Sequence, residues 1–89
     1  MAQLSRKGDQ NDAGGQIVRG ADTVFANGIA VGLHVSDITS HPNGSPDQSA
    51  KTTEGSPTVF AEGVAVLRMG SGNDCGHKIS QGSPDVFVP

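Results

Sequence analysis

Two separated segments of the chain carry side chains of the types that bind transition metals. Cys75 and His77 stand two residues apart in "GSGNDCGHK", and His41 stands near the end of "SDITSHP". Residues two apart on an extended segment point to the same side, so Cys75 and His77 can face one ion together. A thiolate and two imidazoles favour tetrahedral Zn²⁺, and Fe²⁺ also suits these donors.

A structural zinc site needs four ligands, so these three leave one to be found. The first candidate is His34 in "GLHVSD", the runner-up is Asp12 in "GDQNDAGG", and a water molecule is a third candidate. Each residue also has an ordinary interpretation. Cys75 would be a buried thiol, His34 an exposed strand residue and His41 a plain loop histidine.

The cysteine and its neighbouring histidine also raise the alternative of an enzyme, with Cys75 as nucleophile and His77 as base. Side chains two residues apart on a short turn point alike, but they do not readily reach the geometry of proton transfer. The sequence shows no evident orienting acid and no set of oxyanion donors. We therefore expect no catalytic activity.

The elements that must position these side chains are written as a phrase that occurs three times. The copies are "RGADTVFANGIAV" (residues 19–31), "EGSPTVFAEGVAV" (54–66) and the shorter "QGSPDVFV" (81–88). Asn-Gly between two apolar runs is a strong hairpin signal, because a type I′ turn needs positive φ at both central residues. Each copy is predicted to form a strand, a turn and a strand, and we expect the chain to close the base of the fold in the third copy.

The repeats predict one all-β domain over residues 1–89, with units at about 14–41, 51–77 and 78–89 and a polar loop at 42–53. Three unequal repeats favour pseudo-threefold closure of short strands and hairpins. His41 follows the first unit and the Cys75–His77 pair follows the second, so closure would gather them at one end of the body as a metal site.

The three phenylalanines occupy equivalent places in the repeats. Strand alternation sends Phe25, Phe60 and Phe87 to one face and their neighbours to the other. Because the chain has few other large apolar groups, we predict that the phenylalanines fill the base of the core. The neighbours would then face outward; they are Val24, Ala26, Val59, Ala61, Val86 and Val88.

Composition limits the other functions. Hydrophobic residues make up 34% of 89 residues and there is one cysteine, so the core is thin and no internal disulfide can support it. A metal or a partner remains as the stabilising element. The net charge is −3 and the cations are scattered, which disfavours nucleic-acid binding. No signal-peptide segment and no apolar run of membrane-spanning length is visible, so we expect synthesis in the cytoplasm and no stable membrane association.

The frame "GSPTVFAEGVAVLRMGSGNDCGH", followed by "GSPDVFV", resembles the PAAR-repeat family, named for Pro-Ala-Ala-Arg. The resemblance covers roughly residues 7–88. At the place of the naming tetrapeptide this chain has residues 65–68, "AVLR", and residues 30–33, "AVGL", in the first copy. That departure resembles the bacteriophage-tail branch of the family more than its typical secretion-system members.

The resemblance implies a sharp β-cone with pseudo-threefold symmetry and a metal near its apex, held by three histidines and one cysteine. His41, Cys75 and His77 match three of the ligand positions. Ala13 stands where the family has its N-terminal histidine ligand. His34 would restore the count of three histidines, and Asp12 beside the vacant position is the runner-up.

The function that the resemblance implies is mechanical. The chain would be the metal-stabilised tip of the membrane-piercing spike of a contractile injection machine: a phage tail, a type VI secretion system or an extracellular injection system. One copy would dock on a trimeric β-helical spike protein, with no small-molecule substrate, and be delivered into the target cell envelope. The alternative is a free-standing zinc-binding module that binds a protein partner.

Overall fold

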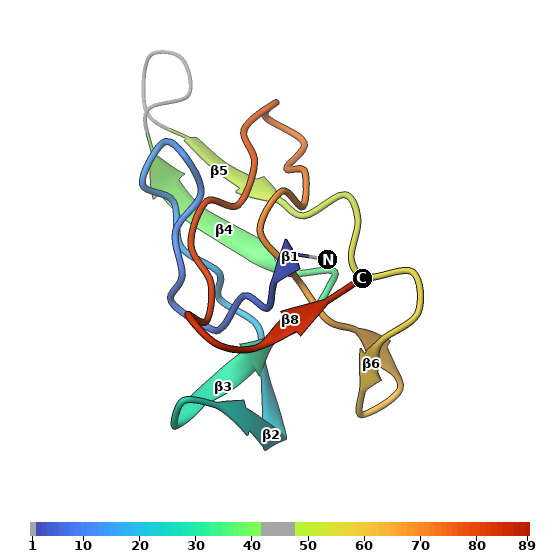
Figure 1. Cartoon of the computed structure of the whole chain (residues 1–89). Coiled ribbons are helices and arrows are strands. Elements are labelled where there is room, and N and C mark those ends of the chain that lie inside the picture. The colour runs from blue at the N-terminus through green and yellow to red at the C-terminus, as the bar shows by residue number, and fades with distance from the viewer. Residues whose placement is uncertain (1, 42–47) are drawn as a thin grey trace.

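The structure is a computed structural model that describes residues 2–41 and 48–89, without the side chains of residues 40, 41, 48 and 49. The described residues form strands, turns and irregular segments, which confirms the all-β prediction (Figure 1). No helix capable of spanning a membrane occurs in these two ranges. The strands are β1 (Ala2–Gln3), β2 (Gly20–Ala26), β3 (Ile29–Gly32), β4 (Asp37–His41), β5 (Gln48–Lys51), β6 (Phe60–Ala61), β7 (Val64–Ala65) and β8 (Phe87–Val88).

The first two copies of the phrase form the hairpins that the sequence predicts. β2 pairs with β3 and β6 pairs with β7, both antiparallel. The turn residues Asn27 and Gly28 have φ of 56° and 77°, and Glu62 and Gly63 have 54° and 78°. Positive φ at both central residues is the conformation of a type I′ turn, which matches the twist of the two strands it joins.

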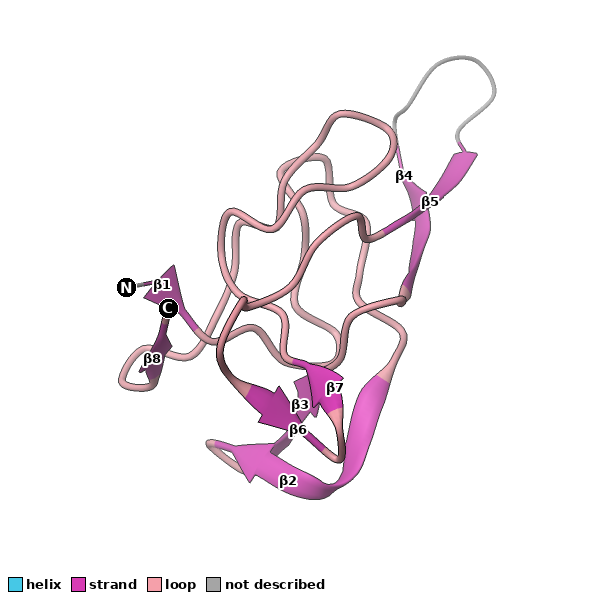
Figure 2. Ribbon diagram, turned by 90° about the vertical axis from the view of Figure 1, so that its right-hand side faces the viewer, coloured by secondary structure: helices cyan, strands magenta, loops and turns pink. Residues whose placement is uncertain are grey.

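The third copy of the phrase forms one strand, β8, which pairs with a strand at the other end of the chain. β8 pairs antiparallel with β1, with Phe87 opposite Gln3 and Val88 opposite Ala2. The N- and C-termini therefore lie side by side (Figures 1 and 2). Figure 2 shows the pairs β1–β8, β2–β3 and β6–β7 on the side of the molecule away from β4–β5. We call the face formed by these three strand pairs the base.

Just beyond the base, three segments of the chain are joined by a closed ring of backbone hydrogen bonds. Ser5 N donates to Leu67 O at 2.9 Å, Leu67 N to Gly32 O at 2.8 Å, and Gly32 N to Ser5 O at 3.0 Å. A second set of three bonds joins the same segments in the opposite direction: Lys7 N to Ala30 O, His34 N to Ala65 O, and Met69 N to Gln3 O, at 2.8, 2.8 and 2.9 Å. Each segment thus satisfies the backbone groups of its neighbours, as buried polar groups require.

The buried apolar side chains form two small clusters. The first cluster consists of Leu4, Ala21, Ala26, Val31, Leu33, Ala61, Val66 and Val88. The second cluster consists of Ile17, Ile38, Ala50, Leu67 and Ile79, with Cys75 packed against it. No aromatic side chain belongs to either cluster, so the core is as thin as the composition indicates.

The prediction that the phenylalanines fill the core is wrong. Phe25 and Phe60 are each 59% exposed and Phe87 is 49% exposed, whereas Ala26, Ala61 and Val88 beside them are buried. Around Phe60 and Phe87 the alternation holds with the two faces reversed, whereas in the first copy Val24 is 38% exposed and only Ala26 is buried.

The physical reason for the reversal is that the strands approach one another too closely at the base. A Cβ added to Gly20 or Gly55 would meet the Cβ of Ala30 or Ala65, respectively, at 3.0 Å. A Cβ on Gly82 would lie 2.9 Å from a backbone oxygen. Only small side chains fit between segments packed at this distance.

The segment predicted to be a polar loop, residues 42–53, also needs correction. Its second half contains β5, which pairs antiparallel with β4, with Ile38 opposite Ala50. Both residues are buried in the second apolar cluster, which explains why a polar segment with a single apolar residue holds this register. Residues 42–47 lie outside the described residues.

Candidate functional site

The candidate metal ligands Cys75 and His77 lie on a tight turn, loop 73–77, that has a structural counterpart in loop 11–15. Asn73 N donates to His77 O at 2.8 Å, and Asn11 N donates to Gly15 O at 2.7 Å. Both turns contain a glycine with positive φ: Gly76 at 91° and Gly14 at 92°. When the two turns are matched by this hydrogen bond and this glycine, Ala13 is the counterpart of Cys75 and Gly15 is the counterpart of His77.

Polar contacts join loop 11–15 to loop 73–77 and to Lys78, which follows it. Asn11 Nδ2 donates to Asn73 Oδ1 at 3.0 Å in a buried hydrogen bond. Asp12 N donates to Lys78 O at 2.9 Å, and Asp12 Oδ1 lies 2.8 Å from His77 Nδ1. Both loops lie at the end of the molecule where β4 and β5 lie, opposite β2, β3 and β6, which we call the apical end (Figure 1).

The structure distributes the other predicted ligands unevenly. Asp12, the runner-up, contacts His77, whereas the His34 ring bonds Thr52 Oγ1 through Nδ1 at 3.0 Å and its backbone N–H donates to Ala65 of the base. His41 is the last residue of β4 and pairs with Gln48, but its side chain lies outside the described residues. Within residues 2–39 and 50–89, no three side chains of His, Cys, Asp or Glu gather closely enough to hold a metal by themselves.

The base presents the three phenylalanines in equivalent backbone positions. Phe25 lies opposite Ala30 in its strand pair, and Phe60 lies opposite Ala65. Phe87 lies opposite Gln3 in the pair of the two chain ends. Each phenylalanine thus belongs to a different antiparallel strand pair, and each ring is exposed; the equivalence of their environments stays a prediction.

Contacts between hairpins hold the base together at its edge. The Glu62 carboxylate accepts from Thr23 N at 2.9 Å and from Thr23 Oγ1 at 2.6 Å. Asn27 Nδ2 donates to Asp85 Oδ1 at 2.8 Å. The Thr23 hydroxyl lowers the pKa of Glu62 below its ordinary value of 4.5, and the Asn27 amide likewise lowers the pKa of Asp85. Both carboxyl groups thus favour the ionised form that the contacts need.

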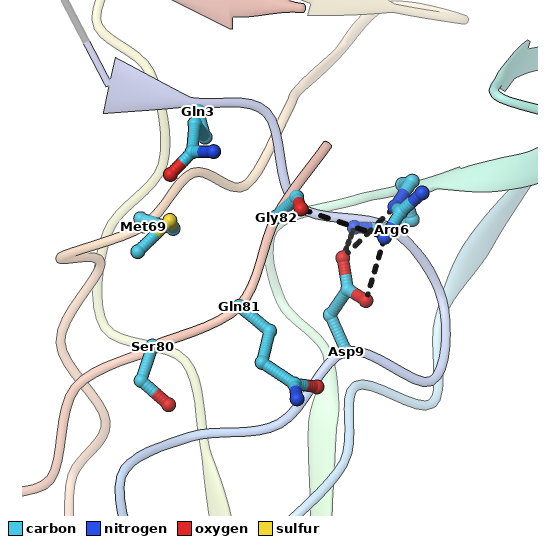
Figure 3. A pocket seen from close by; sticks show the side chains of 7 residues that line it. All are labelled: Gln3, Arg6, Asp9, Met69, Ser80, Gln81 and Gly82. Carbon is cyan, nitrogen blue, oxygen red and sulfur yellow. Dashed lines mark hydrogen bonds and ion pairs between the residues drawn. The ribbon is translucent and has the colours of Figure 1, made fainter. Parts of the chain in front are cut away.

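A shallow groove of about 320 Å³ runs beside the N-terminal segment (Figure 3). The Arg6 guanidinium in it is paired with Asp9 at 3.1 Å and donates to Gly82 O at 3.5 Å. The remaining lining side chains are those of Gln3, Met69, Ser80 and Gln81. None of these lining residues is a histidine or a cysteine, so the groove contains none of the predicted metal ligands.

Comparison with known families fits this arrangement of strand pairs and loops. The family model described as PAAR motif matches residues 7–81. The chain belongs to the PAAR-motif family. Among curated proteins, none matches the chain. The PAAR match spans both apical loops and the residues of the first backbone ring except Ser5.

Sequence reasoning missed the pairing of the two apical loops of this PAAR-motif chain, although a signal was present. Residues 11–15 read "NDAGG" and residues 73–77 read "NDCGH", so the Asn-Asp-x-Gly pattern occurs twice. The two asparagines of this pattern bond each other, and the first aspartate contacts His77. The repeated pattern marks the two turns more directly than the histidines do.

Proposed function

We propose that the chain is the sharp tip of the membrane-piercing spike of a contractile injection machine. One copy would sit on the blunt end of a trimeric β-helical spike protein. The observation that carries this proposal is the cyclic order of the backbone rings through Ser5, Gly32 and Leu67. A single chain that contacts three equal subunits needs three similar faces, and a pseudo-threefold body supplies them.

The exposed phenylalanines support the proposed docking face. One phenylalanine comes from each of the three strand pairs of the base, and each is about half exposed or more. Large apolar side chains gathered on one face mark an interaction site, and aromatic residues are enriched at the centre of interfaces. In this proposal each ring contacts one subunit of the spike.

We also propose that a metal ion, Zn²⁺ before Fe²⁺, stabilises the apical end. Cys75 and His77 share one turn, and the His77 ring is held by a carboxylate, which is the usual second partner of a metal-bound histidine. Those two residues and His41 would hold the ion. When bound, zinc would link segments that are far apart in the sequence, and its binding energy would add to the stability of a thin-cored fold.

The proposed role is mechanical and non-catalytic. The tip would be made in the cytoplasm, assembled at the end of a phage tail, a type VI secretion system or an extracellular injection system, and driven into the target cell envelope. Its partner is the spike trimer, with no nucleic acid, no small-molecule substrate and no lasting membrane association.

The proposal is tested by mixing the purified chain with a trimeric β-helical spike protein and measuring the mass of the complex by light scattering and native mass spectrometry. One copy per trimer is expected. Three copies per trimer would contradict docking as a single tip, and no complex would contradict docking altogether. Metal content without docking would favour the free-standing zinc module. Elemental analysis of protein never exposed to chelator is expected to show one equivalent of zinc.

A further inference from the structure

We propose that Asp12 is a positioning residue for His77: its carboxylate holds the Nδ1–H of the ring, so that Nε2 is the nitrogen presented to the metal. This inference rests on the proposed metal site and names the part that loop 11–15 plays in it. In place of a ligand, that loop contributes the group that orients a ligand of the other loop.

The distance between the two side chains fixes the direction of the hydrogen bond. Asp12 Oδ1 lies 2.8 Å from His77 Nδ1, and the two side chains are 53% and 33% exposed. An ionised carboxylate only accepts hydrogen bonds, so the ring nitrogen that faces it carries the proton. In the neutral ring the lone pair then resides on Nε2, which is the form that a histidine adopts when it binds a metal through that atom.

Asp12 is held by its backbone, which makes its carboxylate a fixed reference for the ring. Asp12 N donates to Lys78 O at 2.9 Å, next to His77 in the chain. The preceding residue, Asn11, pairs with Ile79 and forms the buried 3.0 Å bond to Asn73. The two loops therefore hold Asp12 and His77 in register before any ion binds, which is the preorganisation that second partners of metal ligands provide.

The counterpart of Asp12 in the other loop shows why this position supplies an orienting group. Asp74 also bonds sideways to a neighbouring segment: its carboxylate accepts from Lys51 N at 3.1 Å, and its own N–H donates to Lys51 O at 2.9 Å. In both turns the aspartate thus reaches across to the next segment. The positions that carry Cys75 and His77 in one loop carry Ala13 and Gly15 in the other, so loop 11–15 has no soft donor to offer.

The decisive measurement uses the wild-type protein loaded with one equivalent of Zn²⁺. Long-range ¹H–¹⁵N correlation spectra of the histidine rings report which nitrogen of His77 carries the proton. A protonated Nδ1 with a metal-shifted Nε2 is expected. A protonated Nε2, or a His77 ring unchanged by zinc, would overturn the inference without any variant being made.

A matched pair of variants separates orientation from ligation. Asp12→Asn should lower Zn²⁺ affinity, measured by chelator competition, by about 10- to 100-fold, which is typical for loss of a second partner. Asp74→Asn, at the equivalent place in loop 73–77, should leave the affinity within about threefold of wild type, because the Asp74 carboxylate bonds the backbone of Lys51 and, among the described side chains, no histidine ring.

The absorption spectrum of the Co²⁺-substituted protein completes the test. The visible bands report the number and type of ligands, so Asp12→Asn should leave their position and intensity unchanged. A shift of these bands would make Asp12 a ligand and refute the orienting role, as would unchanged Zn²⁺ affinity. A wild-type chain that takes up neither ion yet docks on the spike trimer would refute this inference and leave the proposed docking function standing.

Discussion

Truncation of one base phenylalanine should weaken docking by about as much free energy as it costs the fold, without preventing the chain from folding. Phe60 is 59% exposed, so about 41% of its surface is covered by the rest of the chain. A fully buried Phe→Ala change costs about 3–5 kcal/mol, and the covered share scales this to about 1–2 kcal/mol of stability. The exposed share is what a partner can cover. Full burial of such a side chain yields about 1.5–3 kcal/mol, so loss of this share should weaken docking by about 1–2 kcal/mol, or roughly 5- to 30-fold in Kd.

The assay compares Phe25→Ala, Phe60→Ala and Phe87→Ala with the wild type. Thermal unfolding gives the stability of each variant, and surface plasmon resonance on an immobilised spike trimer gives its Kd. The three variants should behave alike, because the three rings occupy equivalent backbone positions. Val18→Ala is the control, since Val18 is 45% exposed but lies outside the strand pairs of the base.

Two results would refute this reasoning. Single variants that fail to fold would mean that the phenylalanines belong to the core, as the sequence alone predicts. If the free energy of unfolding of the variants lies within about 2 kcal/mol of the wild-type value and their Kd for the spike is unchanged, another face meets the spike.

Three further changes test the fold itself. Val35 has φ of 63°, whereas its counterparts in the other two units, Gly8 and Gly70, have φ of 91°. Because the left-handed backbone region disfavours a β-branched residue, Val35→Gly should stabilise the protein by about 1 kcal/mol in chemical unfolding. Destabilisation would contradict this prediction. The lowered pKa of Glu62 means that its contact with Thr23 stabilises the fold above pH 4.5, and that this stabilisation is lost as the pH falls below that value through the folded-state pKa. Glu62→Gln should therefore have a lower melting temperature than the wild type at pH 7 and the same melting temperature at pH 2. An equal difference at both pH values would refute this prediction. Arg68 Nε is buried without a partner among the described residues, whereas Arg6 is paired with Asp9, three residues further along the chain. Ser71→Asp should supply the missing carboxylate to Arg68 and raise the melting temperature. A lower melting temperature would show that the cost of burying the new charge exceeds the gain from the ion pair.

The sequence predicts the local structure of the base well, because the hairpin turns depend on residues that are adjacent in the chain. Asn27-Gly28 and Glu62-Gly63 adopt the positive φ of a type I′ turn, and both hairpins form where expected. Alternation likewise separates Phe60 from its neighbours, but a period of two does not say which face is inside. That choice depends on how closely the three segments approach, and this distance is a property of the closed fold.

The apical end was less predictable because its contacts join residues far apart in the sequence. Nothing in the spacing of the histidines indicates that Asp12 would contact His77, or that the His34 ring would bond Thr52. The prediction of Cys75, His77 and His41 as a shared metal site stays a prediction. The repeated Asn-Asp-x-Gly pattern would have matched the two loops, but only the structure shows that they face each other.

The pairing of β1 with β8 has a consequence for the order in which this chain folds. The hairpins β2–β3 and β6–β7 join neighbouring residues and can form as soon as each leaves the ribosome. Ala2, by contrast, can pair only after Val88 has been synthesised. Such a non-local pair slows folding, because the entropy cost of closing nearly the whole chain into a loop precedes the gain from the contact. We expect the chain to remain incompletely folded throughout its own synthesis and to close in one late step, after translation has added Phe87 and Val88.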